Sequence, residues 1–279
     1  MKILFLTLLA SALSLIVSVK AGAVEYQSPR TLGLGGAGRA APLLNDAIYL
    51  NPSHASFTPI YSLYAGYVRF ESGRNYNVSV LDSRTELFQA GLGYTVREGD
   101  AVVNLGASKQ VIERLGVGLG SKVILGRNGE RPLSELNIST SFVALPWMYT
   151  SLIIDNLIED RTRISKGLYR TAYLAFKFIP ARKIEFFVDP LYSPSYALGK
   201  KAGFSAGMEL GMLEDFYLRV GKFQDGEIAH LGTRGSGHGF GLGWIAPKLN
   251  VEYALSRTLQ THTTGGGDVA HSGALTVFY

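Results

Sequence analysis

The fold is decided by stretches in which apolar residues recur at every second position, and the clearest is residues 202–212, AGFSAGMELGM. One parity of this stretch carries Phe204, Met208 and Leu210, and the other carries glycine, serine and Glu209. Successive side chains of a β-strand point to opposite faces. The stretch therefore predicts a strand with one apolar face and one small or polar face.

The same alternation recurs along most of the chain after residue 57, separated by short connectors rich in Gly, Pro and Asp. Connectors of this length join antiparallel neighbours, which predicts a meander of hairpins. There are fourteen such stretches, an even number as in single-chain bacterial barrels, or twelve if the two weakest, 101–109 and 147–156, are not strands. We expect strands at residues 58–71, 75–83, 86–97, 101–109, 114–125, 134–144, 147–156, 167–179, 182–190, 199–212, 215–223, 236–246, 248–258 and 269–279.

Composition narrows the class of protein. The 279 residues include 33 glycines and no cysteine, 47% are hydrophobic and only 18% are charged. This apolar content at small net charge excludes a disordered chain. The absence of cysteine excludes disulfide scaffolds, zinc ribbons and thiol catalysis.

Residues 1–23 are typical of a secretory signal peptide. Lys2 precedes an apolar run at residues 3–17, and the small triplet Ala21-Gly22-Ala23 follows, with cleavage expected after Ala23. The alternative is an uncleaved helical anchor, for which the run is short. Removal of the peptide lowers the net charge from +5 by two lysines, and the remaining charge is too small to indicate nucleic-acid binding.

Two all-β architectures fit the alternation, a soluble sandwich or lipocalin-like barrel and a transmembrane barrel. A soluble sheet places its charges on the face opposite its apolar core, toward water. If the apolar parity faces lipid instead, the charged parity lines a polar lumen. We therefore expect an antiparallel up-and-down transmembrane β-barrel over residues 58–279, surrounded by outer-membrane lipid of a Gram-negative cell. The lumen charges would be Lys122, Lys177, Glu209, Arg219 and Glu252.

Residues 24–57 do not alternate and carry two motifs, TLGLGGAG at residues 31–38 and NDAIYLNPS at residues 45–53. In order and spacing these motifs resemble the N-terminal region of the FadL-type outer-membrane barrels, a family of long-chain fatty-acid transporters with PorV-like relatives. The resemblance implies that residues 24–57 fold inside the barrel as a plug, or hatch. Its motif residues are Gly33, Gly35, Gly36, Gly38, Asn51 and Pro52.

Sites of other kinds receive little support. Gly33, Gly35 and Gly38 fit the G-x-G-x-x-G of dinucleotide sites, but no apolar strand precedes them and no acid follows at the required distance. The pairs Ser236/His238 and His271/Ser272 lack the sequence context of outer-membrane lipases and deacylases. No carboxylate spacing fits a metal site. We predict no enzyme activity, no catalytic residue, no metal and no cofactor.

The turn at residues 213–215 places Glu209 opposite Arg219 on the lumen face, where the pair can fix the strand register or anchor the plug. By the family resemblance, the expected function is passive uptake of small hydrophobic, fatty-acid-like compounds, which leave through a gap in the wall after the plug shifts. The alternative is a PorV-like structural or secretion-associated barrel that binds a partner protein and transports nothing. The longest expected loops, 224–235 and 259–268, are short for capturing a ligand, which favours the alternative.

Overall fold

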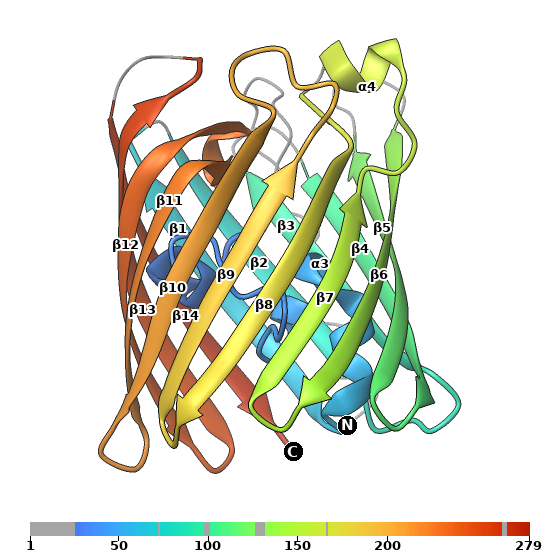
Figure 1. Cartoon of the computed structure of the whole chain (residues 1–279), viewed down its shortest axis with the longest axis vertical. Coiled ribbons are helices and arrows are strands. Elements are labelled where there is room, and N and C mark those ends of the chain that lie inside the picture. The colour runs from blue at the N-terminus through green and yellow to red at the C-terminus, as the bar shows by residue number, and fades with distance from the viewer. Residues whose placement is uncertain (1–25, 72, 98–100, 126–131, 166, 264–266) are drawn as a thin grey trace, which may run out of the picture.

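The structure is a computed structural model that describes residues 26–71, 73–97, 101–125, 132–165, 167–263 and 267–279 (Figure 1). The expected signal peptide at residues 1–23 lies outside these residues. Within the described residues, fourteen antiparallel strands close into one barrel, in which β1 pairs with β14 and every other strand pairs with its neighbours in sequence. The predicted all-β, up-and-down barrel of fourteen strands is confirmed.

Both of the weakest sequence patterns form strands, β4 and β7. No helix among the described residues is long and apolar enough to cross a lipid bilayer. The short helices are α2 (Pro29–Gly33), α3 (Asp46–Leu50), η1 (Pro52–Phe57), α4 (Arg161–Ser165) and η2 (Ala229–Leu231). The strands are β1 (Tyr61–Phe70), β2 (Gly73–Asp82), β3 (Gln89–Arg97), β4 (Ala101–Ile112), β5 (Leu115–Leu125), β6 (Leu133–Leu145), β7 (Met148–Asp155), β8 (Thr171–Ala181), β9 (Ile184–Tyr192), β10 (Ala202–Met212), β11 (Phe216–Ile228), β12 (Thr233–Ala246), β13 (Leu249–Thr261) and β14 (Asp268–Phe278).

The two faces of the wall divide as the alternation predicts. In β10, Ser205 and Glu209 are buried, whereas Phe204 and Met212 are exposed. Large apolar side chains are exposed on the outer face of the other strands as well. An apolar outer face around a polar lumen is the arrangement of a transmembrane barrel, because the outer side chains then meet lipid.

Residues 26–60, which we call the inner segment, lie inside the barrel (Figure 1, blue). Helix α2 packs against β11 to β14, while α3 and η1 pack against β3 to β6. The inner segment thus touches both halves of the wall and occupies the lumen between them.

The two ends of the barrel differ in their connections. At the end that holds Tyr279 the hairpins are short, as at residues 213–215, whereas at the other end residues 156–170 join β7 to β8 and include α4 (Figure 1). Outer-membrane barrels have short periplasmic turns and longer extracellular loops. We therefore assign the end bearing α4 as extracellular.

The expected long loop at residues 224–235 was wrong. β11 runs to Ile228 and β12 begins at Thr233, with a register shift between Phe223 and Gly226. The polar run that suggested a loop instead lies at the lumen face, where Glu227 binds Arg39 of the inner segment. Polar composition indicated exposure to water, but in this barrel the polar face is the inside.

We predict that charge on the outer face destabilises the barrel according to depth. Leu105 lies at the middle of β4 and is exposed on the outer face, so Leu105→Arg should lower the free energy of unfolding by about 2–4 kcal/mol. Leu87, in the turn between β2 and β3, lies beyond the strands, and Leu87→Arg should cost less than about 1 kcal/mol. Urea unfolding in lipid vesicles measures both, and equal effects would contradict a lipid-facing apolar parity.

Candidate functional site

Glycines on the lumen face let the backbone of the inner segment approach the wall. A Cβ added to Gly221 of β11 would overlap the carbonyl carbon of Leu34, and one added to Gly239 of β12 would overlap the carbonyl oxygen of Leu32. Both contacts would fall below the 3.0 Å that real Cβ atoms keep. At these positions any side chain would displace the inner segment.

The four motif glycines form the tight turn after α2 and its contact with the wall. Gly35, Gly36 and Gly38 have φ angles of +66°, +84° and +119°, a region that glycine adopts without strain. Gly33 lies against Gly241 of β12, since an added Cβ on Gly33 would be 3.0 Å from the Gly241 Cα.

Asn51 and Pro52 lie where α3 meets η1. The fully buried Asn51 donates from Nδ2 to the carbonyl oxygen of Arg39 at 2.8 Å and to Oγ of Ser141 at 2.9 Å, and Ser53 Oγ donates to its Oδ1 at 2.6 Å. These bonds join two parts of the inner segment to β6. Pro52 begins η1. Proline has no backbone N–H, and at the first position of a helix this group would have no partner within the helix.

A row of charged side chains of alternating sign crosses the lumen. Glu209 accepts hydrogen bonds from Arg30 Nε at 3.1 Å and Arg219 Nε at 2.5 Å, and Arg219 Nη1 donates to Glu252 at 2.5 Å. At the other end of the row, Arg30 lies 4.0 Å from Glu185, which binds Lys177 Nζ at 2.8 Å. In order the row reads Lys177, Glu185, Arg30, Glu209, Arg219, Glu252.

Three cations and three anions make this row neutral, and each of its inner members has a partner on both sides. Arg219 is fully buried, so its charge depends on the two carboxylates that flank it. The structure places Glu209 opposite Arg219 in the β10–β11 ladder. Arg30, which links the two wall pairs, belongs to the inner segment.

Lys122 lies apart from this row. It is buried on β5 opposite Glu135 of β6, and Glu135 binds Arg163 of α4 at 2.6 Å. Four of the five predicted lumen charges are therefore brought into one row, and the fifth belongs to a separate group near the extracellular end.

Arg39 ties the inner segment to a second part of the wall. Its guanidinium lies 3.4 Å from Asp155 and 3.0 Å from Glu227, and its Cζ lies 3.8 Å from the ring centre of Tyr173. The backbone N–H groups of Gly38 and Arg39 both donate to Asp189 Oδ2 at 2.9 Å. Arg30, Arg39 and Asp189 were not singled out from the sequence.

Burial also shifts the pKa of a carboxyl group within the inner segment. Asp46 on α3 accepts hydrogen bonds from Tyr26 Oη at 2.5 Å and Ser28 Oγ at 2.8 Å. Although these bonds stabilise the carboxylate, desolvation outweighs them and raises the pKa of Asp46 to about 6.

The hydrogen-bonded ladder between β8 and β9 lacks two residue pairs beside Asp189. The missing pairs are those of Leu174 with Pro190 and of Ala175 with Asp189. The pairs on either side of them keep one register. Proline has no N–H to donate to a neighbouring strand, so a ladder is weakest where it contains one. We call this part of the wall the β8–β9 seam.

An apolar cluster lies directly behind the seam. It contains Ala40 of the inner segment and four wall residues, all almost fully buried: Ile153, Tyr173, Ala175 and Leu191. Ala175 itself belongs to the interrupted part of the ladder. Ala40 is the member of this cluster that covers the wall residues from the lumen side.

Two small hollows lie between the inner segment and the wall. Each has a volume of about 30 Å³, enough for about two water molecules. One borders Arg39 and Asp189, and the other borders Arg234 nearer the extracellular end. Neither can hold an aromatic ring, so passage of a solute would require the inner segment to move.

No protein-family model matches the sequence, and no curated protein matches it either. Among solved structures, the chain is similar to the CymD monoaromatic hydrocarbon channel, with a TM-score of 0.65 and 11% identity over 93% of this chain and 99% of that one. It is also similar to the Pseudomonas putida toluene transporter TodX, with a TM-score of 0.63 and 9% identity over 93% and 99% of the two chains. The Ralstonia pickettii toluene transporter TbuX gives a TM-score of 0.62 and 10% identity over 91% and 98%.

These likenesses show the fold. The resemblance to FadL-type outer-membrane barrels, read from residues 31–53, is confirmed at that level, because the three similar structures are barrels of this type. They are channels and transporters rather than enzymes.

We predict that a methyl group on Gly221 dislodges the inner segment. Gly221→Ala would bring Cβ onto the Leu34 carbonyl, whereas Gly273→Ala, the control on the outer face, would meet its nearest atom only at 4.0 Å. Arg30 and Arg39 are almost fully buried in the wild type. Trypsin should therefore cleave after them in folded Gly221→Ala but not in Gly273→Ala, and equal resistance of both variants would contradict the proposed packing.

We predict that Arg219→Met is strongly destabilising. It leaves Glu209 with Arg30 alone and Glu252 without its arginine, and breaking a buried pair in this way costs about 3–5 kcal/mol. Arg182→Met, in the exposed turn between β8 and β9, provides the control and should change stability by less than about 0.5 kcal/mol. Denaturant unfolding of both variants measures the difference, and a cost below about 1 kcal/mol for Arg219→Met would show that the row carries little stability.

Proposed function

We propose that the chain is a channel of the Gram-negative outer membrane for passive uptake of small hydrophobic compounds, with residues 24–57 as its plug. The observation that carries the proposal is the apolar cluster behind the β8–β9 seam. An apolar solute that reaches this cluster has lipid on the other side of an incomplete ladder. It can leave sideways without crossing a water-filled exit.

The plug controls access to that cluster. Ala40 covers the wall residues, and the two backbone bonds to Asp189 hold residues 38–39 against the seam. A shift of these residues would uncover Ile153, Tyr173 and Leu191 and free Asp189 at the same time. Such a shift would break the two bonds to Asp189 and the ion pairs of Arg39 with Asp155 and Glu227.

The cluster suits an aliphatic chain or an aromatic ring. The solved relatives of this fold include monoaromatic hydrocarbon channels and toluene transporters. For a fatty-acid-like compound, Arg39 lies close enough to the cluster to pair with the carboxylate once the plug shift releases it from Asp155 and Glu227. We therefore include fatty-acid-like compounds within the proposed substrate class.

The second candidate is a non-transporting barrel that binds a partner protein. It is favoured by the small size of the two hollows bordering Arg39 and Arg234, each of about 30 Å³. The two candidates differ in one measurable respect, since only a channel admits solute.

A disulfide across the seam tests the channel and its route together. Phe176 and Val188 are paired on the outer face next to the interruption, and opposed residues of this kind lie about 4.5–5.5 Å apart, within disulfide reach. The chain has no native cysteine, so Phe176→Cys/Val188→Cys forms a single bridge and keeps Pro190. Toluene uptake into proteoliposomes should fall to that of protein-free vesicles on oxidation and recover on reduction.

The matched control is Phe240→Cys/Leu255→Cys, a paired outer-face position in the part of the β12–β13 ladder that is continuous from Gly237 to Ala246, and its uptake should not change on oxidation. Uptake that persists in the oxidised seam variant would disprove the lateral route while leaving a channel. Wild-type uptake no greater than that of protein-free vesicles would disprove the channel and favour the partner-binding barrel.

A further inference from the structure

A band of basic side chains crosses the outer face of six neighbouring strands, from the middle of β11 to the extracellular ends of β1 and β2. The cross-strand register places Lys222 beside His238, His238 beside Arg257, and Arg69 between His271 and Arg74. All of these side chains are exposed. We call them the basic band: Lys222, His238, Arg257, His271, Arg69 and Arg74.

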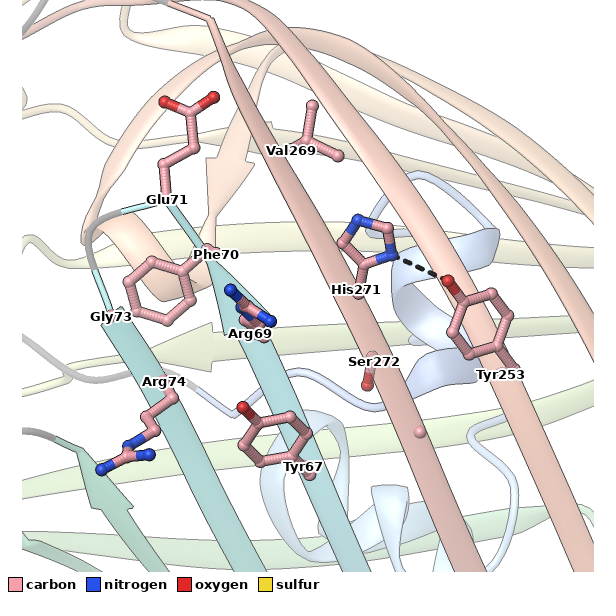
Figure 2. Close-up of a pocket in the computed structure, with 11 residues that line it drawn as sticks. Tyr67, Arg69, Phe70, Glu71, Gly73, Arg74, Tyr253, Val269, His271 and Ser272 are labelled. Carbon is pink, nitrogen blue, oxygen red and sulfur yellow. Dashed lines mark hydrogen bonds between the residues drawn. The ribbon is translucent and has the colours of Figure 1, made fainter.

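The band borders a hollow on the outer face of the wall. Figure 2 shows Arg69, Arg74 and His271 around this hollow, with Tyr67 and Tyr253 on its membrane side. Its volume is about 1070 Å³, and the Tyr253 hydroxyl lies 2.7 Å from His271 Nδ1. Hydroxyl, imidazole and guanidinium groups thus converge on one concave surface that belongs neither to the lumen nor to the seam.

Positive charge dominates this surface. Four of the six band residues are lysine or arginine, and among the residues that line the hollow the carboxylate is Glu71. Asp268, at the start of β14, faces the lumen instead, where it binds His230 at 2.6 Å. The outer surface therefore presents several cations against one anion.

The position of the band along the strands fixes its depth. On β1, Tyr67 is the next outward residue toward the periplasmic end from Arg69, and on β2 Tyr76 follows Arg74 in the same direction. The two tyrosine rings lie 5.1 Å apart. Aromatic residues mark the membrane interface of such barrels, so Arg69 and Arg74 lie above them, at the level of the lipid headgroups of the outer leaflet.

Cations at that level meet headgroups rather than water alone. Guanidinium groups bind phosphate through two parallel hydrogen bonds, and neighbouring cations on a rigid wall can hold two phosphates at once. The tyrosine hydroxyls and His271 can bond to sugar hydroxyls, while acyl chains lie on the apolar face below. A headgroup with several phosphates on a sugar scaffold satisfies all of these groups.

We propose that the basic band and its hollow bind a phosphorylated glycolipid of the outer leaflet, of the lipopolysaccharide class. Arg69 and Arg74 hold one phosphate at the hollow, and Arg257 with Lys222 supports the headgroup along the neighbouring strands. This site does not depend on transport, because none of its residues contributes to the inner segment, the charged row or the seam.

Native mass spectrometry of the purified, folded barrel with diphosphoryl lipid A tests the site. Arg69→Gln/Arg74→Gln should reduce bound lipid A at least about tenfold, since each interfacial cation attracts anionic lipid. Wild-type protein should also bind lipid A stripped of both phosphates at least about tenfold more weakly. Arg182→Gln, which removes a cation at the periplasmic end, should retain wild-type binding.

Folding of each variant is checked by heat-modifiable migration on gels, and Arg257→Gln provides a second disruption of the band if the double variant does not fold. Equal lipid A binding by the wild type and the folded band variants would overturn the proposal. So would equal binding of phosphatidylglycerol and lipid A, which would indicate attraction to any anionic lipid. Displacement of lipid A by millimolar inorganic phosphate would likewise show a simple phosphate site rather than a glycolipid site.

Discussion

Contact between two backbones, without side chains between them, is the constraint on which this barrel depends. The carbonyl groups of Leu32 and Leu34 lie against Gly239 and Gly221, which places α2 at the wall rather than at the barrel axis. From that position Arg30 reaches Glu209, and the turn that follows brings residues 38–39 to Asp189. A residue with a Cβ at either glycine would move α2 and the arginine with it.

Electrostatics then makes the inner segment and the wall interdependent. At membrane depth an unpaired charge is costly, so the carboxylates of the wall need cations, and the inner segment supplies Arg30 and Arg39. The neutral row across the lumen satisfies this need while leaving no net charge to attract ions. Near the apolar cluster, it is Arg39 and the two backbone bonds to Asp189 that hold the inner segment against the wall.

The barrel itself was predictable from the sequence because its physical cause is local. Alternation at period two is written into each strand, and short connectors force neighbouring strands to pair, so the strand count and the inward face of residues such as Glu209 followed directly. Glu209 could be placed opposite Arg219 once the single turn at residues 213–215 was identified. Residues 24–57 gave no periodic signal, and their relation to the barrel came from a family resemblance.

Features that depend on distant contacts were not predictable. Arg30 and Arg39 find their partners more than 100 residues away in sequence, and no local pattern marks those partners. The charged arginines in an otherwise sparsely charged segment were a signal that could have been used. Pro190 was visible within an expected strand. Only the register showed that it keeps its pairing with β10 and lacks a ladder pair with β8. The supposed loop at residues 224–235 failed because polarity was taken to mean exposure to water.

The separation in sequence between α2 and its partners has a consequence for the order of assembly. Helix α2 precedes every strand, yet it packs on β11 to β14, the last four strands to be made. A chain that has formed only its first ten strands holds an arginine-bearing helix with no surface to receive it. Helix α2 must therefore wait for the C-terminal hairpins, whereas α3 and η1 pack on β3 to β6 and meet their surfaces earlier. The inner segment thus reaches its final position in two steps, the second of which comes when the last strands close the barrel.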